Sequence, residues 1–487
     1  MYIRKTKSRN SICFQIGEKL SGRFVVRKHV GCASTPETIE VIRLKAKQVL
    51  HEWLHDNQLS LFGSGIQPPV AKLTRWKITG FHHVFGTVYD RIGFPNNLLR
   101  DLVVARIVYP KSKLATIRYL SRYLGITIEK NRLFRFLDTL DKNKLTRIAF
   151  NFVASRHPKG ISVCFYDVTT LYFETTNEDD IRKKGFSKDH RTDVPQILIG
   201  LFVDSDGYPF DFDFYEGKTF EGHTFVQAIK TIRQKYSFPE LTIVADAGML
   251  SQDNLEYLDS IQVSYIVGAR LKNLPQKVIG EILNHKYREQ PFFQTTIGSQ
   301  RLIVDYSPDR AKLDSKNRDR TVTRLKQKLA TGKEVIRKSK YLLTYDRNEI
   351  KGIDEEKIKF DQEFDGLKGY FINQNNALPL TEIISQYHQL WRVEKAFRIS
   401  KHDLRERPIF HRHKNRIEAH LVLCFISLLV LKETERYLAK INCSPEQAIE
   451  LLGKAGEGKV RIGNIELKTE SELETTTQLI HNLFKGH

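Results

Sequence analysis

The sequence predicts a mixed α/β fold in which a largely helical region precedes a mixed sheet. Three observations lead to this fold class. Residues 161–270 alternate short apolar runs, typical of buried strands, with stretches of helical period. Residues 76–157 have a helical period almost throughout. With 487 residues, of which 40% are hydrophobic, the chain is long enough for about three domains with large cores.

The charge balance predicts a polyanionic partner. The chain has 78 Lys and Arg against 57 Asp and Glu, which gives a formal net charge of +21. Nucleic acid is the first candidate, because neutralisation of phosphates dominates its binding to proteins. The alternative is a basic protein whose charge has no dedicated partner.

Neither a membrane span nor a disulfide framework is expected. The longest apolar run, residues 421–431, has eleven residues, whereas a helix needs about 20 to cross a bilayer, so a buried helix is the better interpretation. The cysteines are odd in number, widely spaced and without a CxxC pair, which favours reduced thiols in a cytoplasmic protein. The basic N-terminus also lacks the apolar core of a signal peptide. The five cysteines are Cys13, Cys32, Cys164, Cys424 and Cys443.

The first 157 residues divide into two parts. Residues 1–75 are predicted to form strands and then a helix, because short alternating runs precede a helical pattern. Residues 76–157 form the helical region, in which two amphipathic pieces flank Gly125. A DNA-binding helix-turn-helix and a helical linker with a solvated basic face explain these pieces equally well. The arginines that mark them include Arg118, Arg122 and Arg132.

The remaining chain divides by pattern into four parts. Residues 158–274 hold the alternating strands and helices, including a hairpin with its turn at 204–207. Residues 275–375 mix strand-like runs with a charged helical stretch, as expected of an insertion. Residues 376–440 contain two strong helical patterns, and residues 441–487 form a C-terminal region.

Two aspartates follow apolar runs suited to buried strands. Asp167 comes after "ISVCFY" and Asp246 after "LTIVA", and each is expected where its strand leaves the sheet. Ligands bind at the carboxyl ends of strands in open α/β sheets. Two carboxylates on neighbouring strands repel each other unless a cation compensates, and their hard oxygen atoms suit Mg²⁺ or Mn²⁺. The plainer alternative is that each aspartate caps a turn.

Glu394 is the candidate for a third acid. It shares a helical stripe with Tyr387, Leu390, Phe397 and Lys401. A helix packed on the sheet would point this carboxylate at the two aspartates, and three carboxylates can hold two metal ions about 3.5–4 Å apart. A solvated glutamate is the alternative.

The stretch "YHQLWRVEKAFRISK" resembles the Y-(2)-R-(3)-E-(6)-K signature of bacterial insertion-sequence transposases of the insertion-sequence-four group and its long-chain relatives. Tyr387, Glu394 and Lys401 match the signature in spacing. The similarity continues in "FYDVTTLYFET", "GFSKDHRTDVPQILIGLFVDSDGYPF", "IVADAGMLSQDNL" and "RPIFHRHKNRIEAHLVLCFISLLV", over about residues 80–435. The resemblance implies an RNase H-like sheet flanked by helices, with a mainly β insertion before the catalytic Glu helix. It also implies a catalytic DDE triad of Asp167, Asp246 and Glu394.

One signature position departs from the pattern. The arginine is replaced by Leu390, and Arg392 lies roughly 200° round an ideal helix from it. The arginine's DNA-phosphate contact therefore passes to Lys401, Arg398 or another base, or is weakened. Trp391 is expected either to stack on a flipped base, as the resemblance implies, or to pack in the core.

The resulting expectation is a DNA transposase that binds terminal inverted repeats and moves its element by cut and paste. The triad would bind two Mg²⁺ ions, with Mn²⁺ able to substitute. The partners would be double-stranded end and target DNA, with a homodimer on paired ends and no membrane. A metal-dependent nuclease without strand transfer and a catalytically inactive DNA-binding descendant stay open as alternatives. The expected DNA-binding residues are Tyr387, Trp391, Arg392, Arg398, Lys401, Arg118, Arg122 and Arg132.

Overall fold

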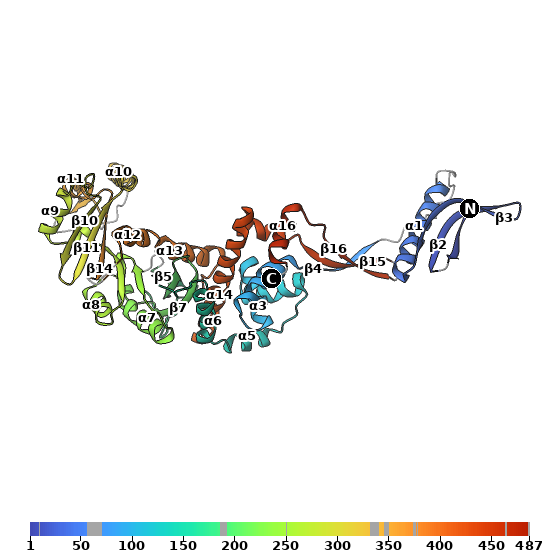
Figure 1. Cartoon of the computed structure of the whole chain (residues 1–487), viewed down its shortest axis with the longest axis horizontal. Helices are drawn as coiled ribbons and strands as arrows, with labels where there is room; N and C mark the ends of the chain where they lie inside the picture. Colours follow the sequence, from blue (N-terminus) through green and yellow to red (C-terminus); the bar gives the residue numbers. More distant parts are fainter. Residues whose placement is uncertain are drawn as a thin grey trace. The chain divides into compact units, whose positions relative to one another are not determined.

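The computed structural model of the chain forms two compact units (Figure 1). The first combines Met1–Val84, Tyr119–Thr127 and Ile441–His487, and the second combines Phe85–Arg118 and Ile128–Lys440. The domain borders expected from the sequence stay predictions. The residues that the structure describes are 1–8, 10–55, 71–185, 192–249, 251–331, 340–344, 350–373, 376, 378–462 and 465–485.

The second unit is built on an eight-stranded mixed sheet in the order β10-β11-β14-β9-β8-β5-β6-β7. β5, β8 and β9 are mutually parallel, and the other neighbours pair antiparallel. This arrangement confirms the predicted RNase H-like sheet. The strands are β5 (Val163–Tyr172), β6 (Gln196–Asp204), β7 (Pro209–Glu216), β8 (Thr242–Ala245), β9 (Ser264–Ala269), β10 (Phe292–Ile297), β11 (Gln300–Tyr306) and β14 (Leu367–Asn373).

Helices cover both faces of this sheet, because alternate residues of its strands are apolar on each side. α7 (Glu221–Lys235) packs on one face, where the rings of Phe225 and Tyr166 lie 5.7 Å apart. α14 (Lys414–Leu438) packs on the other, where Phe425 lies 5.2 Å from Phe212. Leu201 pairs with both Phe212 and Asp167, so Asp167 lies on the α14 face. Other helices packed on the sheet include α6 (Lys142–Ala154), α8 (Gln252–Ser260), α12 (Leu380–His388) and α13 (Trp391–Arg398).

The insertion between β9 and α12 completes the sheet. Its strands β10, β11 and β14 are the three outer strands beyond β9, and β12 (Leu342–Thr344) pairs with β13 (Ile350–Ile353). The insertion also contains α9 (Gln276–Asn284), α10 (Pro308–Ala330) and α11 (Glu355–Gln362).

A group of helices precedes the sheet in the chain. The apolar stretch at residues 421–431 is buried in the middle of α14, as predicted, and α14 packs against α3, α5 and α6. No helix among the described residues is long and apolar enough to cross a membrane. The helices of this group are η1 (His82–Gly86), α2 (Thr87–Ile92), α3 (Asn97–Val108), α4 (Lys113–Tyr119), η2 (Leu120–Leu124), α5 (Lys130–Asp138) and α6 (Lys142–Ala154).

The first unit contains two three-stranded sheets. β1 (Tyr2–Ser8), β2 (Ser11–Leu20) and β3 (Arg23–Ala33) form one, against which α1 (Pro36–His55) packs. β4 (Lys72–Ile78), β15 (Gly456–Ile462) and β16 (Ile465–Glu470) form the other. The unit also contains α15 (Pro445–Leu452) and α16 (Thr475–Phe484).

The prediction that all cysteines are reduced is wrong for two of them. Cys13 of β2 and Cys32 of β3 form a disulfide. They are 19 residues apart in sequence but directly opposite in the strand pairing, with their Cα atoms 4.0 Å apart. Wide sequence spacing concealed this pair, because only the register of the hairpin brings the two thiols together.

Candidate active site

Strand pairing brings Asp167 and Asp246 to adjacent positions. Tyr166 of β5 pairs in parallel with Ala245 of β8, and each aspartate is the next residue in its chain. β8 ends there, as predicted, but β5 continues to Tyr172 in its pairing with β6. The expectation that β5 ends at Asp167 is therefore wrong. What ends at this point is the parallel pairing, so both carboxylates lie where β5 runs beyond its shorter neighbour.

Tyr387 lies over Asp246. It is a buried residue of α12, and its hydroxyl donates a hydrogen bond to Asp246 Oδ1 over 3.3 Å. Gly268 of β9 makes room for this contact, because a Cβ there would collide with the tyrosine hydroxyl. Burial and the negative charges of Asp246 and Glu394 raise the pKa of Tyr387, so the phenol stays a proton donor at neutral pH.

The helix that carries Glu394 is not continuous with the helix that carries Tyr387. α12 ends at His388, α13 begins at Trp391, and Leu390 between them is buried. Glu394 is exposed on α13, and its charge acts on Tyr387. Asp246 and Glu394 thus both lie around the same tyrosine.

Lys401 approaches the sheet from the short π-helix that directly follows α13. It lies in η5 (Ile399–Asp403), and its Nζ donates a hydrogen bond to Thr169 Oγ1 over 2.6 Å. Thr169 is two residues beyond Asp167 on β5, hence on the same face of the strand. The signature lysine is therefore held next to the strand that carries the first aspartate.

Three carboxylates from two neighbouring strands and one helix fit a divalent ion such as Mg²⁺, which prefers hard oxygen ligands. Their ligand atoms do not all lie within 4.8 Å of one another. Among the described residues, two other groups do: Cys13, His29 and Cys32, and His157, Asp204 and Asp206.

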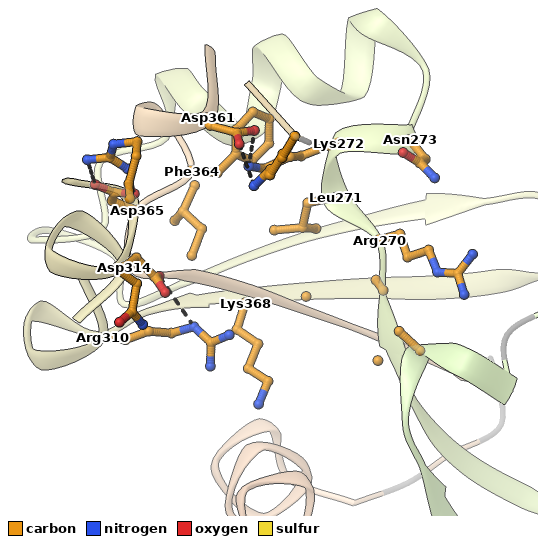
Figure 2. A pocket seen from close by; sticks show the side chains of 18 of the residues that line it. Arg270, Leu271, Lys272, Asn273, Arg310, Asp314, Asp361, Phe364, Asp365 and Lys368 are labelled. Atoms are coloured by element: carbon orange, nitrogen blue, oxygen red, sulfur yellow. Dashed lines mark hydrogen bonds and ion pairs between the residues drawn. The ribbon is translucent and has the colours of Figure 1, made fainter. Parts of the chain in front are cut away.

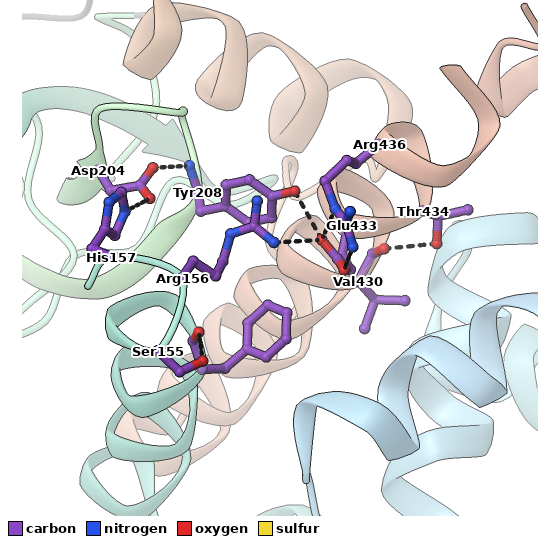
Figure 3. A network of polar contacts seen from close by, with 10 residues as sticks. Ser155, Arg156, His157, Asp204, Tyr208, Val430, Glu433, Thr434 and Arg436 are labelled. Carbon is purple, nitrogen blue, oxygen red and sulfur yellow. Dashed lines mark hydrogen bonds and ion pairs between the residues drawn. The ribbon is translucent and has the colours of Figure 1, made fainter. Parts of the chain in front are cut away.

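The group around Asp204 is structural (Figure 3). Asp204 is fully buried, and its Oδ1 accepts the backbone N–H groups of Asp206 and Tyr208 in the predicted hairpin turn. Its Oδ2 lies 2.7 Å from His157 Nε2, and this hydrogen bond raises the pKa of His157. Because both oxygens are engaged, Asp204 holds the hairpin and is a poor metal ligand.

The other predicted DNA-binding residues lie at the surface. Trp391 is 51% exposed, so the alternative of a core tryptophan is wrong. The Arg392 guanidinium is half-buried, stacks 5.5 Å from the Trp391 ring and bonds Gln389. The remaining four, Arg398, Arg118, Arg122 and Arg132, are not all in one unit, and every one of them is exposed.

The helix-turn-helix prediction concerns α4, η2 and α5. Gly125 ends η2 with φ 66°, a left-handed conformation that glycine adopts without strain. α5 begins five residues later, buries Leu133 and Leu137, and exposes Arg132. Helices therefore precede and follow Gly125 in the chain, while their binding to DNA stays a prediction.

A pocket of about 620 Å³, shown in Figure 2, includes Asp246 and Tyr387 among the residues that bound it. Its lining contains six basic residues that sequence reasoning missed: Arg270, Lys272, Arg310, Arg318, Lys340 and Lys368. Two of them, Arg310 of α10 and Lys368 of β14, bear on the candidate site (Figure 2). Lys368 Nζ lies 4.5 Å from the centroid of the Tyr387 ring, and within the part of the chain described here it has no hydrogen bond or ion pair. Burial and Arg310 lower the pKa of Lys368, whereas Asp305, Asp246 and Glu394 oppose that shift. The negative charges of Asp246 and Glu394 therefore act on Lys368.

Comparisons with known proteins gave a family-model match and similarities to solved structures. A family model described as "Transposase DDE domain" matches residues 158–430. A piggyBac transposase synaptic complex with hairpin DNA is similar over 77% of this chain and 76% of its own, at 11% identity and a TM-score of 0.36. A Mos1 transposase paired-end complex is similar over 46% of this chain and 66% of its own, at 8% identity and a TM-score of 0.17.

No curated protein sequence matches the chain. The two similarities to solved structures are distant, and the family assignment rests on the matched domain. Because that domain covers more than half of the chain, the protein belongs to the DDE transposases, enzymes that catalyse metal-dependent phosphoryl transfer on DNA.

Proposed function

We propose that this transposase binds the terminal inverted repeats of an insertion sequence and moves it by cut and paste. The observation that carries the proposal is the placement of Asp167 on β5 beside Asp246, which directly follows the adjoining β8, with Tyr387 contacting Asp246 and Glu394 acting on that tyrosine. Water would first cut the DNA at the element's end. The new 3′ hydroxyl would then attack the second strand or the target in another in-line phosphoryl transfer.

Asp167, Asp246 and Glu394 are the proposed catalytic and metal-binding residues. Two Mg²⁺ ions, with Mn²⁺ able to substitute, would supply activation of the attacking oxygen and stabilisation of the leaving oxygen. The protein's own part is to hold the acids and the DNA. Tyr387 keeps Asp246 oriented through its hydrogen bond.

Lys401 would bind a phosphate of the cut strand as a point charge. Trp391, whose ring is open to solvent, would stack on a base. Arg398 would contact the backbone from the exposed side of α13, and Arg392 would support Trp391 by stacking on it.

Lys368 and Arg310 would supply the charge that the signature places at position 390. Leu390 is buried and cannot reach DNA. The charges of Asp246 and Glu394 act on Lys368, and Arg310 belongs to the lining of the same pocket. Both side chains come from the insertion, so the compensating charge would enter the site from a different element.

Recognition of the DNA ends is assigned to two basic regions. Arg118, Arg122 and Arg132 are the proposed contacts in the helical region. The first three strands form a second basic surface, since residues 1–33 contain eight Lys and Arg but a single acid, Glu18. We expect the enzyme to act as a dimer on paired ends, at the nucleoid in the cytoplasm.

The test is a cleavage assay on a labelled duplex that carries the repeat flanking the coding sequence. Wild type should nick the repeat boundary in Mg²⁺ or Mn²⁺, whereas Asp167→Asn, Asp246→Asn and Glu394→Gln should lose at least about 10³-fold in rate while still binding DNA. Asp309→Asn is the control, because this acid is exposed on α10. Nicking without joining to a second duplex would indicate a nuclease, and binding without any cleavage by wild type would contradict catalysis.

A further inference from the structure

A second pocket, of about 880 Å³, lies between the start of α4 and the segment after η5. Its lining contains seven Lys and Arg, three His, and no Asp or Glu. We call it the basic groove. Its basic residues are Arg106, Lys111, Lys113, Arg405, Arg407, Arg412 and Arg416, with His411, His413 and His420.

Two of these cations are buried without an acidic partner. Arg106 and Lys113 are each 6% exposed. Among the described residues, Arg106 donates to the backbone oxygen of Leu404 over 3.4 Å, and Lys113 Nζ lies 3.3 Å from His420 Nδ1. Buried cations are normally paired with an anion, because their desolvation is costly. The floor of the groove is therefore a place where an entering anion would be stabilised.

The lining of the basic groove has no carboxylate that would repel an entering anion. Burial lowers the pKa of Lys113 and His420 and brings that of His411 to about 4, and a bound phosphate would raise the pKa of Lys113 again. The nearby carboxyl of Glu406 does not line the groove, and burial raises its pKa to about 7. Of the groove's arginines, Arg416 is paired with Asp138.

The rim adds an apolar contact surface. Phe410 is 68% exposed and Leu114 is 43% exposed, and both belong to the groove. An aromatic ring in a basic channel suits a nucleic acid, which offers bases and sugars besides phosphates, better than a free inorganic anion.

The basic groove lies close to the end of β5, because its lining residues Pro408 and Phe410 flank Ile409 in the chain. Ile409 N donates to Tyr172 O over 3.1 Å, and Ile409 forms a parallel bridge with Phe173, directly after β5. At about 3.3 Å per residue, the six residues from Asp167 to Phe173 span about 20 Å. That is about six nucleotides of duplex at 3.4 Å each.

We propose that the basic groove binds the backbone of the DNA being cut, about six nucleotides from the scissile phosphate. This inference rests on the proposed function for the position of the cut, but the binding itself does not depend on catalysis. Arg405 and Arg412 would contact phosphates at the rim, Phe410 would lie against a sugar or base, and Lys113 would attract the backbone from below.

Binding should be measured in EDTA on end duplexes that stop about 3 or about 12 nucleotides beyond the cleavage position. Wild type should bind the longer duplex about tenfold more tightly. The Arg405→Gln/Arg412→Gln variant should lose that gain and lower the salt slope by about 1 to 2, since each phosphate contact contributes about 0.9. Lys316→Gln/Arg320→Gln removes the same charge from exposed positions of α10 and should change neither quantity.

Two single variants separate binding from folding. Phe410→Ala alters an exposed ring and should weaken binding several-fold with an unchanged Tm. Lys113→Met should lower DNA affinity and raise Tm, because it removes a buried amine whose desolvation is costly. Unchanged affinity and salt slope in the groove variants would contradict DNA binding by the basic groove, even if wild type cleaves DNA normally. If wild type binds the longer duplex more tightly but never cleaves it, the proposed function is refuted, while DNA binding by the basic groove is still supported.

Discussion

At position 390 the family signature has an arginine, and this chain has a leucine that is 6% exposed. Catalysis on DNA requires a positive charge close to the reacting phosphate, and any residue that reaches this place can supply it. Lys368 is our proposed source of that charge, because it lies over the Tyr387 ring and the charges of Asp246 and Glu394 act on it. The sequence showed the departure at 390, but it did not point to Lys368, the residue that we propose compensates for it, which comes from a strand at the far end of the insertion.

Replacing Lys368 should therefore impair cleavage more than binding. We expect Lys368→Gln to slow nicking of end DNA by about 10- to 100-fold, since it removes a charge that acts on the reacting phosphate. Lys368→Arg should retain most of the rate. Lys316→Gln, which removes an exposed lysine of α10, is the matched control. Equal single-turnover rates for Lys368→Gln and wild type would show that this lysine has no part in the reaction.

At the scale of single elements, local patterns predicted the strands and helices but not their junctions. The apolar runs before Asp167 and Asp246 are strands, as predicted. The predicted hairpin turn at 204–207 is also present, and the Asp204 carboxylate stabilises it by accepting backbone hydrogen bonds. The end of β5 was misplaced, because its continuation depends on pairing with β6. The insertion strands join the main sheet through the pairing of β14 with β9, a contact between distant segments that no local period reveals.

The break between α12 and α13 was also missed. A helical stripe through 387–401 suggested one helix, yet the chain turns at Gln389 and Leu390, and Leu390 packs in the core. Restoring the signature with Leu390→Arg should therefore bury a charge and lower the free energy of unfolding by about 3 kcal/mol. Chemical denaturation measures this loss. The same substitution at the exposed Ser385 of α12 should cost under about 0.5 kcal/mol, and equal effects at both positions would contradict the buried role of Leu390.

At the scale of the second unit, a polar network connects the helical region to the sheet and to α14 (Figure 3). His157 follows α6 and bonds Asp204 of the hairpin. Tyr208 of the same hairpin donates to Glu433 of α14, which also binds Arg156 and Arg436. The network thus joins three parts of the chain that are far apart in sequence, and it raises the pKa of one of its members, His157.

This network should make stability depend on pH through His157. The hydrogen bond to Asp204 raises the pKa of His157 above its usual value of about 6.5. The charged pair therefore contributes its full stability below about pH 6.5 and loses it as the pH rises through the folded-state pKa. The difference in unfolding free energy between wild type and His157→Gln should be larger at pH 6 than at pH 9. His402→Gln, at an exposed position, should show no such trend, and a constant difference for His157→Gln would mean that the imidazole is held by packing rather than by its charge.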